Sequence, residues 1–164
     1  MDPEHLARWF DAYSGGLGLY ARQWLGEDQA QDTVQVAFVR LMGQRREPTD
    51  VQAWLYRTVR NEAVTRLRRR ARRCRGNWLR SAGQPRWFES RPEDLIDAQR
   101  AQEILMTLPV ERREVVPPRI WGQLSLKQIG GIVGRPLTTV QSRYKAALAA
   151  IKERMQESCE TTRE

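Results

Sequence analysis

The sequence predicts an all-α protein made of two small helical domains that are joined by a linker. Apolar residues recur at spacings of three and four, and no convincing alternation of β-branched residues is present. The stretch 74–92 loses this helical period and gathers glycine and proline, as linkers do. A chain of 164 residues with 40% hydrophobic residues is long and apolar enough to bury a core. We therefore divide it into residues 1–73, a linker 74–92, and residues 93–164.

The N-terminal part begins with two predicted helices, over residues 3–13 and about 17–25. Gly15 and Gly16 are expected to separate them, and Gly26 to end the second. A third helix is predicted from Asp28 to residue 41 or 42. Its apolar residues recur at helical spacing and leave polar residues on another face; they are Ala30, Val34, Phe38 and Leu41.

The fourth predicted helix follows a polar break and carries the arginine-rich segment. Thr49, which can pair with Gln52 in a capping box, or Asp50 can cap its N-terminus. Trp54 is more typical of a core residue than of a stacking one. One stripe of the helix is apolar, formed by Val51, Leu55, Val59, Ala63 and Leu67.

In the linker, Trp78, Trp87 and Phe88 indicate a segment that docks on another surface, and Cys74 is interpreted as a small hydrophobic residue. Helical pattern resumes near residue 93 and continues to Leu108. A further helix over 110–116 should end at Pro117 and Pro118, because proline inside a helix costs about 3 kcal/mol.

The last 40 residues predict a helix-turn-helix. Ser125 and Gln128 form a capping box for a short helix that ends near Val133, with Leu124 and Ile129 placed as a hydrophobic staple. A turn over 134–137 follows. Thr138 and Gln141 form a second box that opens a longer helix, whose apolar stripe is Val140, Tyr144, Ala147, Leu148 and Ile151.

The positive charge of the chain is concentrated in its middle. Residues 51–92 hold twelve arginines against Glu62 and Glu89, and seven of the ten residues 66–75 are arginine. Residues 1–50 hold five basic and eight acidic groups, and residues 93–164 hold eleven and ten. A basic segment of this kind attracts a polyanion, and nucleic acid is the partner that we favour. A solvated basic helix end and an acidic membrane surface are the alternatives.

Several classes of protein are excluded by what the sequence lacks. No apolar run approaches the roughly 18 residues of a membrane span, and no signal peptide is recognisable at the N-terminus, so we expect a cytoplasmic protein with no membrane partner. Cys74 and Cys159 stand far apart, and His5 is the only histidine, so we expect no metal site and no cofactor. No constellation of catalytic residues supports an enzyme.

Two stretches carry a family resemblance. Residues 27–41 (EDQAQDTVQVAFVRL) with 53–61 (AWLYRTVRN) resemble region 2 of bacterial sigma factors. The segment from Leu108 through 124–129 (LSLKQI) to 139–143 (TVQSR) resembles region 4. Two such regions and only a linker are similar to the extracytoplasmic-function (ECF) group. The resemblance implies an alternative sigma factor that binds core RNA polymerase, directs it to promoters and promotes strand opening.

The resemblance also implies site residues. The helix over 28–42 would bind the clamp helices of the polymerase β′ subunit through Asp28, Gln31, Asp32 and Gln35, and the β flap is a further expected contact. The melted strand of the −10 element would be held by Asn61, near a flipped base, and by Tyr56, Arg57, Arg60, Arg66, Arg68 and Arg69. The helix-turn-helix would bind the −35 element as duplex through Thr138, Thr139, Gln141, Ser142, Arg143 and Lys145. An anti-sigma factor is a possible further partner.

The sequence departs from the family pattern at several places. Val36 replaces a usual Glu, Gln141 replaces a common basic residue, and Pro117-Pro118 stands where relatives carry helix formers. Gly130 and Gly131 lie inside the first helix of the helix-turn-helix, where each costs about 1 kcal/mol relative to alanine. The alternatives to a sigma factor are a self-sufficient helix-turn-helix repressor or activator, which would need a dimerisation or sensing part, and a nucleic-acid enzyme.

Overall fold

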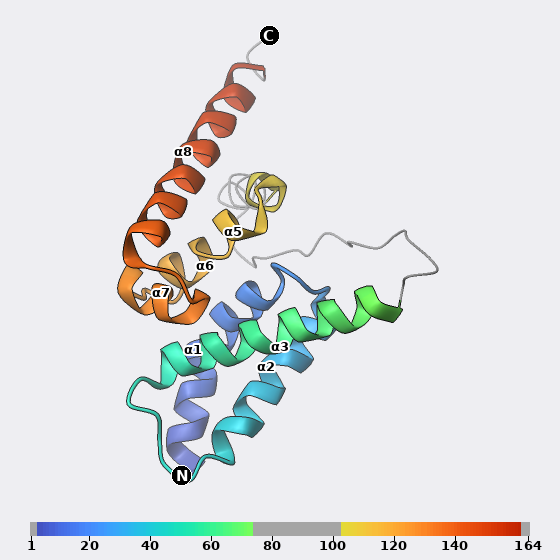
Figure 1. The fold of residues 1–164 in the computed structure, drawn as a ribbon, viewed down its shortest axis with the longest axis vertical. Coiled ribbons are helices and arrows are strands. Elements are labelled where there is room, and N and C mark those ends of the chain that lie inside the picture. The colour runs from blue at the N-terminus through green and yellow to red at the C-terminus, as the bar shows by residue number, and fades with distance from the viewer. Residues whose placement is uncertain (1–2, 74–102, 162–164) are drawn as a thin grey trace.

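The computed structural model describes residues 3–73 and 103–161, and every regular element in these ranges is a helix (Figure 1). This confirms the predicted all-α class. The predicted linker 74–92, with Cys74, Trp78, Trp87 and Phe88, lies outside the described residues, as does the start of the helical segment at residue 93. In chain order the helices are α1 (Pro3–Ala21), α2 (Glu27–Met42), α3 (Val51–Arg73), a short helical stretch over 103–107, α5 (Val110–Arg113), α6 (Val116–Ile120), α7 (Leu126–Val133) and α8 (Leu137–Thr161).

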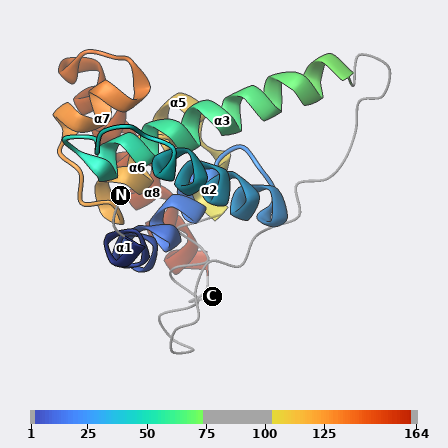
Figure 2. The ribbon, with the colours of Figure 1, turned by 90° about the horizontal axis from the view of Figure 1, so that it is seen from below.

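Helices α1, α2 and α3 pack on one another and form the N-terminal lobe (Figures 1 and 2). The predicted α2 stripe faces this core, because Ala30, Val34, Phe38 and Leu41 are all buried. Trp54 is half-buried and packs against the same core, as expected for a core residue.

The predicted break at Gly15-Gly16 is wrong, because α1 runs through both glycines to Ala21. Gly16 has a packing role. A Cβ atom at this position would lie 2.6 Å from the Tyr56 hydroxyl of α3, closer than any real contact. Helix α1 therefore contains a glycine where an aromatic side chain from α3 approaches its backbone, and tertiary packing overrides the low helix propensity of the pair.

Helix α3 begins at Val51, and its cap is Asp50, the second of the two predicted candidates. The Asp50 Oδ1 atom accepts a hydrogen bond of 2.9 Å from the backbone N–H of Ala53. The predicted stripe is buried at Leu55, Val59 and Ala63, but Leu67 is exposed. The reason is visible in Figures 1 and 2, where the last turns of α3 extend beyond α1 and α2.

The C-terminal lobe corrects the role of the two prolines. The helical turn α5 ends at Arg113, and Pro117 and Pro118 lie in the first turn of α6, so they begin a helix and do not end one. A proline needs no backbone N–H partner in the first turn, and its φ angle suits that position. The break therefore falls at Glu114 and Val115.

The helix-turn-helix is confirmed as α7, a turn and α8. Both hydrogen bonds of the capping box are present: Ser125 Oγ accepts from the Gln128 backbone N–H at 3.2 Å, and Gln128 Oε1 accepts from the Ser125 N–H at 2.8 Å. Leu124 and Ile129 are both buried, as the staple requires. Gly134 ends α7 in the left-handed conformation, with φ of 68°.

Helix α8 differs from its prediction in two details. It begins at Leu137, with the Val140 N–H bonded to the Pro136 carbonyl at 3.1 Å, so Thr138 lies inside the first turn and does not precede the helix as a cap. Val140 and Ala147 are buried as predicted, whereas Leu148 is exposed. Leu148 lies on the outer side of α8, because its neighbours Ala147 and Ile151 still pack against the core.

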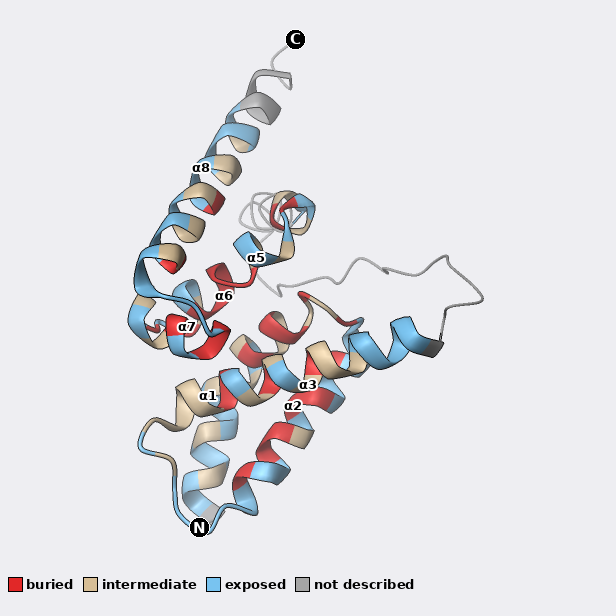
Figure 3. Ribbon diagram, in the orientation of Figure 1, coloured by how far each residue is buried: buried red, intermediate tan, exposed pale blue. Residues whose placement is uncertain are grey.

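The two lobes pack against each other, with α6 on α1 and α7 on α3. Figure 3 shows buried residues inside each lobe and also where the lobes meet. The buried hydrophobic side chains of both lobes form one continuous cluster. The candidate sites on α3 and α8 therefore lie beside a shared interface.

Candidate nucleic-acid interface

The exposed face of α2 carries the predicted polymerase-binding residues. Asp28, Gln31, Asp32 and Gln35 are all exposed, opposite the stripe that packs into the lobe. Among the residues that the structure describes, the one ion pair on this face is a long one of 3.9 Å between Asp32 and Arg66. The face is thus available for a partner, as a binding surface must be.

Two apolar residues, which the sequence reasoning missed, extend this face. Val39 is 66% exposed and Met42 is 57% exposed. Helical spacing places both in line with Asp28, Asp32 and Gln35. A face that is acidic and polar at one end and apolar at the other suits a protein partner better than it suits nucleic acid. The helical period of the sequence alone could have placed Val39 and Met42 on this face.

On α3, the structure separates the predicted strand-binding residues into two groups. Arg57 and Asn61 are exposed one turn apart, and Arg68 and Arg69 are exposed on the last turns. These four side chains could contact phosphates or bases without rearrangement. Arg60 and Arg66 are half-buried and already paired with carboxylates of the chain.

The expectation that Tyr56 contacts DNA from the surface does not hold in this arrangement, because Tyr56 is 1% exposed. A Cβ atom on Gly16 would lie 2.6 Å from the Tyr56 hydroxyl oxygen, and a Cβ atom on Gly122 would lie 2.9 Å from it. Its ring packs on Tyr20 with centroids 5.2 Å apart. Burial raises the pKa of Tyr56 above its ordinary value. Tyr56 therefore acts here as a packing residue between the lobes.

Glu62 organises the charged side of α3 that faces α2. Its carboxylate accepts hydrogen bonds from Arg40 at 2.6 Å and from Arg66 at 3.1 Å. Burial alone would raise the pKa of Glu62, but the two arginines outweigh it and lower this pKa below its ordinary value. The pairs link α2 to α3 and fix Arg66 close to the face predicted to bind polymerase.

The helix-turn-helix presents most of its predicted DNA-binding residues at the start of α8. Thr138, Gln141, Ser142 and Lys145 are exposed, and Thr139 is half-buried. Arg143 differs from these residues because it is half-buried and pairs with Glu114 at 3.5 Å. The exposed set lies at the N-terminal end of the second helix, where recognition helices meet base edges and phosphates.

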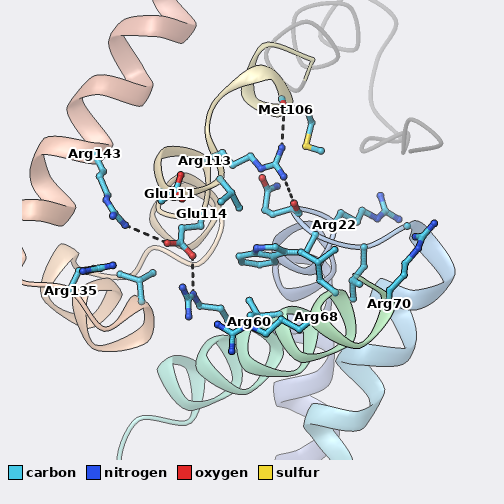
Figure 4. A pocket seen from close by; sticks show the side chains of 18 residues that line it. Arg22, Arg60, Arg68, Arg70, Met106, Glu111, Arg113, Glu114, Arg135 and Arg143 are labelled. Atoms are coloured by element: carbon cyan, nitrogen blue, oxygen red, sulfur yellow. Dashed lines mark hydrogen bonds and ion pairs between the residues drawn. The ribbon is translucent and has the colours of Figure 1, made fainter. Parts of the chain in front are cut away.

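A cavity of about 1020 Å³ lies where the two lobes meet (Figure 4). The guanidinium groups around it come from α3, from the connection after α1 and from the C-terminal lobe. Its acidic lining residues are Glu111 and Glu114, and Trp24 and Leu25 add apolar surface. The arginines that line it are Arg22, Arg60, Arg68, Arg70, Arg113, Arg135 and Arg143. The basic surface predicted for residues 66–75 is thus continued by arginines from elsewhere in the chain.

No helix within residues 3–73 and 103–161 is long and apolar enough to cross a membrane. Nor do the same residues gather three or more His, Cys, Asp or Glu side chains in a position to hold a metal ion.

Comparison with known proteins agrees with this geometry. Residues 9–73 match the Sigma-70 region 2 family. The sigma factor RpoE from Bartonella quintana, solved in complex with the anti-sigma factor NepR, is similar in structure, with a TM-score of 0.75 and 21% identity over 94% of this chain and 98% of RpoE. CnrH, solved in complex with the cytosolic domain of CnrY, has a TM-score of 0.62 and 21% identity over 95% of this chain and 90% of CnrH. No curated protein matches the sequence significantly.

The residues that match the Sigma-70 region 2 family comprise most of α1 together with α2 and α3. Beyond this domain the fold continues as it does in the two solved structures. The resemblance to sigma factors predicted from the sequence agrees with the family match over residues 9–73 and with the fold of both solved structures.

Proposed function

We propose that this protein is an alternative sigma factor that binds core RNA polymerase, directs it to specific promoters and promotes strand opening. The observation that carries the proposal is a Sigma-70 region 2 domain followed in the same chain by a capped helix-turn-helix. The proposed domains are residues 1–73 for polymerase and the −10 element, 74–92 as linker, and 93–164 for the −35 element.

Polymerase binding is assigned to the exposed face of α2. Asp28, Gln31, Asp32 and Gln35 supply the polar part, and the adjacent Val39 and Met42 supply apolar surface. The β′ clamp helices are the partner for this face, and the β flap is the partner for the C-terminal lobe. An anti-sigma factor is a further proposed partner; RpoE and CnrH, both similar in fold, were each solved with a bound protein.

The −10 strand is assigned to the exposed side of α3. Asn61 lies one turn from Arg57, so a base held at Asn61 would have a guanidinium close to its phosphate. Arg68 and Arg69 continue the charge along the helix, and Arg60 and Arg66 would join them after rearrangement. The −35 duplex is assigned to the first turns of α8, with Thr138, Thr139, Gln141, Ser142, Arg143 and Lys145.

The proposal is tested by transcription from a library of genomic fragments, using the purified chain and core polymerase, followed by sequencing of the transcripts. Initiation from a set of sites that share two sequence elements is the expected result. Absence of initiation from any fragment, with a known sigma factor active on the same core enzyme, would refute it.

Two single substitutions test the −10 and −35 assignments independently of each other. Asn61→Ala should reduce strand opening, read by permanganate reactivity of unpaired thymines, while leaving closed-complex formation intact. Lys145→Ala should weaken binding of the upstream element and leave opening of a premelted template unchanged. The reverse pattern would show that the two lobes are assigned to the wrong elements.

A further inference from the structure

The carboxylate of Glu114 lies at the junction of the lobes and holds an arginine from each of the two DNA-binding helices. Its Oε2 atom accepts a 2.9 Å hydrogen bond from Nε of Arg60 on α3. Its Oε1 atom lies 3.5 Å from a terminal nitrogen of Arg143 on α8. Figure 4 shows both contacts converging on the one carboxylate, and Glu114 is only 4% exposed.

Glu114 is aimed at the N-terminal lobe because the chain leaves the helical conformation there. Residues 114 and 115 form the break between α5 and α6, and Pro117 and Pro118 occupy the first turn after it. The preceding residue, Arg113, donates to the Gln23 carbonyl at 2.5 Å. The last residue of α5 and the first residue of the break thus both bind the N-terminal lobe, Glu114 at α3 and Arg113 at the connection after α1.

Further polar contacts close the same interface. Gln52 Nε2 on α3 donates to the Gly122 carbonyl at 2.6 Å. Gln128 Nε2 on α7 donates to Asp50 Oδ2 at 2.6 Å, so the residue that caps α3 also binds the capping box of α7. These bonds join residues more than 50 positions apart in sequence and have no role within either lobe alone.

We infer that Glu114 is an interdomain latch, which keeps the free chain closed and withholds Arg60 and Arg143 from DNA until the lobes separate. A DNA phosphate and the Glu114 carboxylate compete for the same two guanidinium groups. If the closed form dominates, the apparent DNA affinity of the free chain is lowered by the fraction of molecules that are open. The inference rests on the proposed function for the roles of the two arginines.

The experiment compares Glu114→Gln with Glu111→Gln in the full-length chain. Both variants lose one negative charge from the same short segment, but Glu111 is exposed, and it is Glu114 that pairs with Arg60 and Arg143. We expect Glu114→Gln to increase the radius of gyration, measured by small-angle X-ray scattering. It should also bind a duplex of arbitrary sequence about fivefold or more tightly than Glu111→Gln does.

A second variant covers the case in which Glu114→Gln does not fold. Gln52→Ala removes the bond to the Gly122 carbonyl and places a strong helix former in α3, so it should fold and open the interface in part. If wild type, Glu114→Gln and Gln52→Ala have equal radii of gyration and equal DNA affinities, the proposed role of Glu114 as an interdomain latch is wrong. That result would leave the proposed function intact, because transcription by the wild-type chain with core polymerase tests the function independently.

Discussion

Single residues of this chain have roles that depend on a few neighbouring atoms. Gly130 and Gly131 are adjacent in α7, yet a Cβ atom on Gly130 would lie 2.8 Å from the Arg135 carbonyl oxygen, whereas one on Gly131 would meet nothing within 4 Å. Gly130 thus allows the turn after α7 to close on the helix, through the bond from the Arg135 N–H to the Gly130 carbonyl. Gly131 has no such role and only lowers helix propensity.

The pair gives a matched stability prediction. Gly131→Ala should raise the free energy of unfolding by about 1 kcal/mol, because alanine restricts the unfolded chain and favours the helix. Gly130→Ala should lower it, since the added methyl group displaces the backbone of the turn. Urea denaturation followed by circular dichroism measures both. Equal effects of the two substitutions would contradict the assigned roles.

Glu62 predicts a dependence of stability on pH. Its pKa is lowered in the folded state by Arg66 and Arg40, which outweigh the effect of burial. The group therefore contributes stability that is present above the ordinary pKa of 4.5 and is lost as the pH falls through the lower folded value. Below pH 4.5, Glu62→Gln should make the loss of stability less steep than in wild type, in urea titrations at successive pH values. An equally steep loss of stability in Glu62→Gln and in wild type would contradict this role of Glu62.

At the scale of elements, the helices that carry a capping signal were predictable and those placed by packing were not. The Ser125 box located α7, and the period of α2 identified both its core and its polar face. The break at Gly15-Gly16 was wrong because the approach of Tyr56, an inter-helix contact, decides that position. The prolines were assigned to the wrong end of a helix because proline suits a first turn as well as it ends a helix.

The exposed face of α2 is tested as an element. Asp32→Ala with Gln35→Ala should reduce binding of core polymerase about tenfold or more and leave the melting temperature within a few degrees, since both side chains are exposed. Gln29→Ala is the control, because Gln29 is an exposed α2 residue away from that face. Fluorescence anisotropy with labelled protein measures the affinity. If all variants bind core polymerase equally well, the polymerase does not bind this face of α2.

The capping box of α7 is tested in the same way. Ser125→Ala should lower the free energy of unfolding by about 1 kcal/mol, because the N–H groups of the first turn of α7 lose an acceptor. Ser142→Ala on the exposed side of α8 should change it by less than about half that amount. The free energy of unfolding of each variant is measured by chemical denaturation. A larger effect at Ser142 would contradict the cap.

At the scale of the whole molecule, the charge distribution of the sequence predicts a basic surface on α3, and the structure has exposed arginines there. The sequence does not predict which other residues lie opposite this surface. The cavity between the lobes brings Arg22, Arg113, Arg135 and Arg143 to the same side as the arginines of α3. Asn61 and Arg57 could be proposed as site residues from the sequence because a motif carries them, and both are exposed. Glu114 was not, since its two partners lie 54 and 29 positions away in sequence and only the tertiary fold unites them.

The basic surface predicts a strong dependence of DNA binding on salt. If six or more phosphates are contacted, promoter affinity of the polymerase complex should fall by roughly 10³ or more between 50 and 200 mM salt. Filter binding at several salt concentrations gives the slope of log affinity against log salt. Substituting Arg68 and Arg69 by Gln should make that slope shallower, by about one per lost phosphate contact. An unchanged slope would mean that these arginines face solvent in the complex.

The position of Tyr56 between Gly16 and Gly122 has a practical consequence for dissecting the protein. A fragment ending at residue 73 would lack Gly122 and would leave the ring and hydroxyl of Tyr56 facing water, beside other apolar side chains that the C-terminal lobe now covers. Such a fragment should be less soluble and more easily cleaved by proteases than the same residues in the intact chain. The unit for expression and crystallisation is therefore the pair of lobes together, even though each has its own helices and its own proposed ligand.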